Sequence, residues 1–138
     1  MNLRTFVRAQ TLVFIVAVLM VVFGIAEVIT GVAHDFFGLV TAADAFTTIV
    51  GVGLGLCYVA GGILLLWFTR STVLAAVLLL LVDILGRIAM TLSGMYPVNT
   101  PKQAIGIVGG TLVALVFAGI AFWKYRRLSK GSAAPDTT

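Results

Sequence analysis

Four long apolar stretches, separated by short polar segments, dominate the pattern of the chain. They cover about residues 12–31, 46–68, 72–94 and 104–123. A helix needs about 20 predominantly apolar residues to cross a bilayer. The stretches lack the alternation of a membrane strand, and a helix satisfies its own backbone hydrogen bonds in lipid. The pattern therefore predicts an all-α, four-helix transmembrane bundle in contact with the lipid bilayer. It forms a single domain over residues 1–130, and residues 131–138 form a disordered C-terminal tail.

Polar residues mark where the helices begin and turn. Thr100, Pro101 and Gln103 match a helix start, with Thr as N-cap, Pro at the first position and Gln completing a capping box. Thr41 and Asp44 offer a second capping box before the second stretch. Only residues 69–71 separate the second and third stretches, so these two helices should be antiparallel neighbours.

Composition excludes a soluble fold and limits the chemistry. Hydrophobic residues make up 61% of the 138 residues and charged residues 10%, compared with about 25% charged residues in soluble domains. The single cysteine, Cys57, excludes an intrachain disulfide. No grouped Cys or His suggests a metal or haem site, so no cofactor is expected. An enzyme ranks last among the functions considered, because no nucleophile–base pair or metal motif is visible.

The basic residues predict the orientation. In a four-helix topology, nearly all of them fall on one side of the membrane, which the positive-inside rule makes cytoplasmic. Both termini would then be cytoplasmic and the chain integral to the plasma membrane. These residues account for much of the formal charge of +4, so topology explains that charge better than nucleic-acid binding does. They are Arg4, Arg8, Arg70, Lys124, Arg126, Arg127 and Lys130.

Small residues recur within the apolar stretches and predict helix contacts, because they let backbones approach closely. Gly24 and Gly31 lie seven residues apart in the first stretch, Gly55 lies in the second, and Gly106 and Gly110 form a small-xxx-small pair in the fourth. Packing is the expected role of all of these glycines.

Three ionisable residues fall inside the predicted spans: Glu27, Asp83 and Arg87. An Asp or Arg at the centre of a membrane helix costs about 2.5–3.5 kcal/mol, so such residues normally face the bundle interior and find partners. Asp83 and Arg87 are four residues apart and share a helix face. At about 1.5 Å per residue, Glu27 lies roughly 9 Å and Arg87 roughly 6 Å outside the midplane. We therefore expect Arg87 to bridge Asp83 and Glu27.

This cluster has two interpretations. Arg87 can neutralise one carboxylate, and the other then needs water or a proton. That arrangement would suit a ligand or proton site that opens outward, with Tyr58 near the centre and His34 continuing the path from the following loop. Alternatively, the charges only lock the first helix against the third.

The segment from Gly55 to Leu66, followed by Arg70 and a Leu/Ala-rich run to Val82, resembles the DoxX-like group of small four-helix membrane proteins. Members of that group often carry a Glu three residues before the paired glycines, a position that Tyr58 occupies in this sequence. The resemblance implies a four-helix bundle that serves as an accessory part of a membrane redox or quinone-linked complex.

Together these observations predict a small polytopic membrane protein whose outward-facing polar site binds or passes a small solute or proton. The alternative is an accessory subunit of a membrane complex with no site of its own. A small-molecule ligand, a second copy of the chain and a partner subunit are the partners left open.

Overall fold

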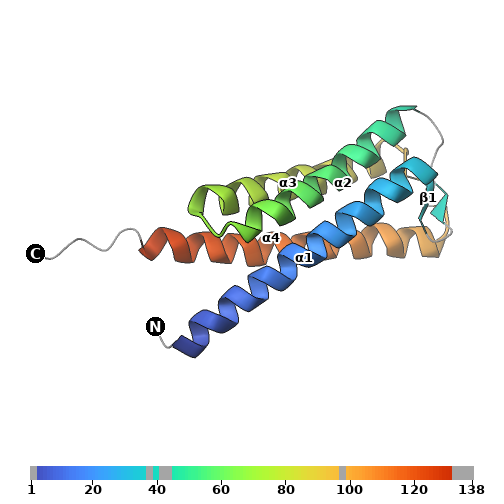
Figure 1. Cartoon of the computed structure of the whole chain (residues 1–138). Helices are drawn as coiled ribbons and strands as arrows, with labels where there is room; N and C mark the ends of the chain where they lie inside the picture. The colour runs from blue at the N-terminus through green and yellow to red at the C-terminus, as the bar shows by residue number, and fades with distance from the viewer. Residues whose placement is uncertain (1–2, 37–38, 41–44, 97–98, 132–138) are drawn as a thin grey trace, which may run out of the picture.

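The computed structural model describes residues 3–36, 39–40, 45–96 and 99–131. In these residues the chain forms four helices, α1 (Leu3–Ala33), α2 (Ala45–Leu66), α3 (Arg70–Leu92) and α4 (Pro101–Gly131), all long and apolar enough to cross a membrane. Figure 1 shows that α1 begins and α4 ends at the same end of the bundle. The predicted helical architecture is confirmed, with four helices that are long and apolar enough to span a membrane. Gly131, predicted as the first residue of the tail, is the last residue of α4. The rest of the predicted tail and the Thr41–Asp44 capping box lie outside the described residues.

The helices differ in length more than the apolar stretches do. α1 and α4 have 31 residues each, against 22 in α2 and 23 in α3. At about 1.5 Å per residue, α1 and α4 are each roughly 12–14 Å longer than α2 and α3. Apolar runs mark only the part of a helix that lies in hydrocarbon, and a helix continues into water when its residues favour it. The apolar stretches 12–31 and 104–123 therefore lie within α1 and α4, and both helices extend beyond them.

Capping interactions set the other helix ends. Thr69 caps α3 in a reciprocal box with Thr72, directly after Phe68, which has a positive φ of 52°. The predicted box at α4 is confirmed, because Thr100 N donates to Gln103 Oε1 at 3.0 Å and Gln103 N donates to Thr100 Oγ1 at 3.3 Å. The tight turn makes α2 and α3 antiparallel neighbours, as predicted (Figure 1).

A small β-ladder joins α1 to α2 and was not predicted. Strand β1 (Asp35–Phe36) pairs antiparallel with β2 (Leu39–Val40), at the end of the bundle opposite the start of α1. Two residue pairs are too few to give a period-two signal in the sequence.

Close backbone contact joins α1 to α2. A Cβ on Gly24 would lie 2.7 Å from the carbonyl oxygen of Gly55, and one on Gly62 would lie 2.7 Å from that of Ala17. A Cβ on Gly31 would lie 3.1 Å from the backbone nitrogen of Val52. The packing role predicted for Gly24, Gly31 and Gly55 is confirmed, because no larger residue fits at this separation.

Gly110 has a different neighbour from the one expected. Among the described residues, and apart from the local backbone, the one atom within 4 Å of a Cβ at Gly110 is Arg87 Nη1 at 3.2 Å. This part of α4 therefore faces an arginine side chain and not a second helix backbone, which corrects the predicted helix–helix contact.

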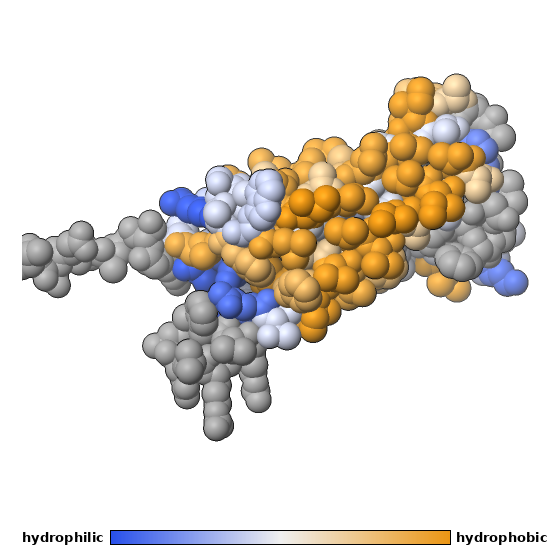
Figure 2. Space-filling view, in the orientation of Figure 1, coloured by the Kyte–Doolittle hydropathy of each residue, from blue (hydrophilic) through white to orange (hydrophobic). Residues whose placement is uncertain are grey.

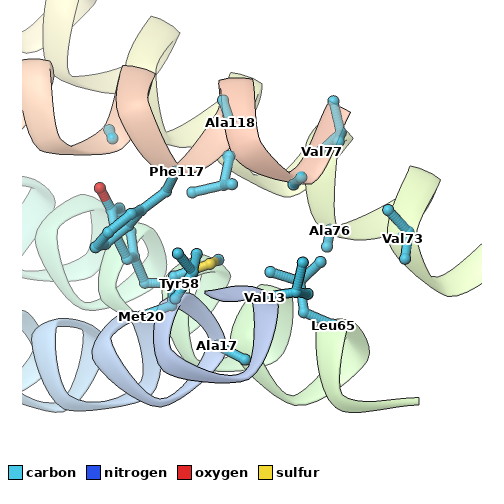
Figure 3. Close-up of a cluster of buried hydrophobic side chains, with 14 of the residues drawn as sticks. Val13, Ala17, Met20, Tyr58, Leu65, Val73, Ala76, Val77, Phe117 and Ala118 are labelled. Atoms are coloured by element: carbon cyan, nitrogen blue, oxygen red, sulfur yellow. The ribbon is translucent and has the colours of Figure 1, made fainter. Parts of the chain in front are cut away.

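All four helices contribute to an apolar core in the half of the bundle nearer the α2–α3 turn (Figure 3). Tyr58 lies at its boundary, with its ring edge-on to Phe117 at a centroid distance of 6.4 Å. The outer surface is an apolar belt with polar residues at both ends (Figure 2), which is the distribution that contact with a lipid bilayer requires. The labelled members of the core in Figure 3 are Val13, Ala17, Met20, Tyr58, Leu65, Val73, Ala76, Val77, Phe117 and Ala118.

Candidate functional site

Beyond this core, in the half of the bundle nearer the β-ladder, Arg87 joins two carboxylates. Its Nε donates to both Asp83 oxygens, at 3.2 Å to Oδ1 and 3.0 Å to Oδ2. Its Nη2 donates to Glu27 Oε2 of α1 at 2.5 Å. The Asp83 side chain is fully buried, and those of Arg87 and Glu27 are 15% and 14% exposed. The predicted bridge between α1 and α3 is confirmed.

Tyr58 completes the inner side of this charge cluster, which we define as Glu27, Asp83 and Arg87. The guanidinium carbon of Arg87 lies 5.6 Å from the centre of the Tyr58 ring. A ring face at this distance attracts a cation electrostatically. The position that the DoxX-like pattern often gives to a glutamate thus supplies an aromatic ring beside the guanidinium.

His34 contacts α2. Its Nε2 lies 3.3 Å from Thr48 Oγ1, and its backbone has a positive φ of 56° directly after the end of α1. Its Nδ1 is buried and has no hydrogen-bond partner among the described residues. The structure therefore ties His34 to the start of α2, and a role for it in a path outward stays a prediction.

Tyr96 follows α3, just beyond its last residue Leu92. Its backbone nitrogen donates to the carbonyl of Met90 at 3.2 Å, so the chain folds back over the end of α3. Burial, reinforced by the Glu27 carboxylate, raises the pKa of the Tyr96 phenol above its ordinary value. The phenol therefore lies within electrostatic range of the charge cluster, on its outer side. No periodicity in the sequence signals this return of the chain.

A groove with about 250 Å³ of space, open at the outer surface, lies between α3 and α4 and reaches Arg87; we call it the α3–α4 cavity. The hydroxyls of Thr91 and Thr111 face it but donate to carbonyls of their own helices, those of Arg87 and Ile107, both at 2.8 Å. The cavity is therefore apolar except where the arginine borders it. Its lining consists of Arg87, Ile88, Thr91, Leu92, Ile107, Val108, Thr111 and Leu112.

The chemistry of the site is that of a fixed charge beside an apolar space. With all three groups ionised, the cluster carries a formal charge of −1. Within the described residues no group of three or more His, Cys, Asp or Glu side chains could hold a metal ion. The arrangement can hold a small molecule by hydrogen bonding and apolar contact.

Comparison with known proteins gives no assignment: no family model, curated protein or solved structure matches the chain. The resemblance to the DoxX-like group therefore stays a prediction from the sequence.

Proposed function

We propose that the protein binds a small solute within the membrane, at the charge cluster and the α3–α4 cavity beside it. The observation that carries this proposal is that the cavity reaches Arg87. A charged residue inside a membrane is costly and is usually retained for function, and a cavity next to it gives a ligand space to use it.

We place the chain in the plasma membrane with both termini in the cytoplasm, so that the charge cluster lies in the outer half of the bilayer. The end of the bundle that holds the α2–α3 turn also holds basic and aromatic side chains in contact. Arg70 Nη2 donates to the Tyr125 hydroxyl at 3.4 Å, and the Arg127 guanidinium lies 4.0 Å from the centre of the Trp123 ring. Basic residues favour the cytoplasmic side, and Trp and Tyr favour the interface.

One observation favours a second function, that of an accessory subunit. Arg87 pairs with both carboxylates without any ligand, so the cluster can serve as a link between helices alone. In that case the cluster joins α1 to α3, and a partner subunit would cover part of the apolar surface.

A ligand screen on the purified protein separates the two functions. Thermal unfolding is measured with each compound for the wild type, for Val108→Trp and for Val116→Trp. Both valines lie on α4 and are 58% exposed, but only Val108 lines the cavity. A ligand at 100 times its Kd stabilises the fold by about 2.7 kcal/mol.

The proposal predicts a compound that stabilises the wild type and Val116→Trp but not Val108→Trp, which fills the cavity and leaves the charges in place. Stabilisation that is equal in both variants would place binding elsewhere. A broad screen without any stabilising compound would favour the accessory subunit.

A further inference from the structure

One nitrogen of the Arg87 guanidinium, Nη1, remains available to a ligand. Nε and Nη2 are bound to the two carboxylates, whereas Nη1 makes no hydrogen bond with the described residues. Nη1 points towards Gly110 of α4, where a Cβ would lie only 3.2 Å away. Nη1 therefore lies against α4 at a glycine position between Val108 and Thr111, two residues that line the cavity, and a larger side chain at this position would crowd it.

The remaining walls supply no competing donor. Each threonine hydroxyl has one proton, and both are given to helix carbonyls. The other lining residues are aliphatic. A ligand in the cavity thus meets a single kind of polar group, a cationic N–H donor, and otherwise apolar contact. A hydrogen bond to such a charged donor is stronger than one between two neutral groups.

Charge selects against ions of either sign. A cation would face the guanidinium directly. An anion would approach two carboxylates that already bind the same guanidinium, in a medium of low dielectric constant where such repulsion is strong. A neutral molecule with an oxygen acceptor avoids both costs.

The cavity is open to the hydrocarbon of the bilayer. Leu92 and Val108 line it and are 83% and 58% exposed on the outer surface of the bundle, which lipid covers. A ligand can therefore arrive laterally from the bilayer without crossing the charge cluster. The volume corresponds to about eight water molecules at roughly 30 Å³ each, which suits a group of one or two rings.

We propose that the ligand is a neutral, lipid-soluble molecule that enters from the bilayer and places a carbonyl or similar oxygen on Arg87 Nη1. This inference rests on the proposed function and specifies the class of ligand for the same site.

The test uses benzophenone, a neutral diaryl ketone that labels nearby C–H bonds under ultraviolet light. The full-length protein is labelled in lipid nanodiscs, and modified residues are identified by mass spectrometry. We expect saturable labelling of α3 and α4 at the cavity, at residues such as Leu92 and Val108. Val108→Trp should abolish it and Val116→Trp should not.

Two competitors test the chemistry of recognition. Diphenylmethane has nearly the same shape as benzophenone but lacks the oxygen, and 4-benzoylbenzoate adds an anionic group. Unlabelled benzophenone should compete at least about tenfold better than diphenylmethane, which corresponds to about 1.4 kcal/mol, and better than 4-benzoylbenzoate.

Gly110→Leu closes the space at Nη1 and should remove the preference for the ketone over diphenylmethane. Gly119→Leu is its control, because a Cβ there meets nothing within 4 Å. Equal competition by diphenylmethane, or stronger competition by the anion, would overturn the proposed ligand class.

Unsaturable labelling spread over all helices would also overturn it. If a charged compound in the ligand screen then stabilises the wild type and Val116→Trp but not Val108→Trp, the proposed binding function is supported and only the ligand class is wrong.

Discussion

Replacing Arg87 by glutamine tests how far the fold depends on the guanidinium that joins α1 to α3. The variant leaves the carboxylates of Glu27 and Asp83 without a counter-charge, and the Asp83 side chain is fully buried. Removing one partner of a buried ion pair costs about 3–5 kcal/mol, because the remaining charge is uncompensated. Since Arg87 itself is 15% exposed, we expect a loss near the lower end of that range.

Glu27→Gln is the matched comparison. It keeps the shape and an amide oxygen that can accept from Nη2, and it leaves Asp83 and Arg87 as a balanced pair. The change replaces a hydrogen bond between ions with one to a neutral acceptor, a difference of about 1 kcal/mol. The triple variant Glu27→Gln, Asp83→Leu, Arg87→Leu removes all three charges of the cluster. Its free energy of unfolding should lie within about 1 kcal/mol of that of the wild type, since apolar replacement of buried ion pairs is often neutral.

The assay is reversible unfolding in mixed detergent micelles, with helicity followed as the fraction of denaturing detergent rises. The expected order of unfolding free energies is wild type and triple variant highest, Glu27→Gln slightly lower, and Arg87→Gln lowest. If Arg87→Gln were as stable as Glu27→Gln, the guanidinium would not be the common partner of both carboxylates, and the energetic account of the cluster would be wrong.

Two further predictions concern packing and pH. Gly55→Leu should destabilise the bundle by about 1–3 kcal/mol through overpacking against α1, whereas Gly53→Leu on the same helix meets open space and should be tolerated in the same unfolding assay. The pKa of the Tyr96 phenol is raised by burial and by Glu27, so Glu27→Gln should lower that pKa towards its ordinary value in an ultraviolet titration, with Tyr96→Phe identifying the step. If Tyr96 titrated with the same pKa in the wild type and in Glu27→Gln, the influence of Glu27 on it would be refuted. Because the folded state favours the neutral phenol, the wild type should also lose stability as the pH rises through the range in which an exposed tyrosine ionises.

The charge cluster was predictable because each of its members is costly in lipid. That cost requires partners, helical spacing supplies Asp83 for Arg87, and the rise per residue places Glu27 at a similar depth. The α1–α2 contact was predictable for a related reason, since glycines such as Gly24 and Gly55 permit close approach.

Features that depend on the separation of helices were not predictable. The α3–α4 cavity depends on the separation of the two helices, which is set by side-chain packing along the whole bundle. No local sequence pattern indicates that separation. Gly110 therefore looked like a helix-contact residue, although it faces an arginine. The start of α1 and the end of α4 extend beyond the apolar stretches, and hydropathy alone does not show how far a helix continues past an apolar run.

The bridge from Glu27 to Arg87 also sets an order of events during synthesis. Sixty residues separate the two partners, which corresponds to about 3–12 s at a translation rate of roughly 5–20 residues per second. Asp83 and Arg87 are four residues apart on α3, so they enter the membrane together and neutralise each other. Glu27 is synthesised first, so a nascent chain that stops before α3 carries an acidic side chain whose partner, Arg87, has not yet been made.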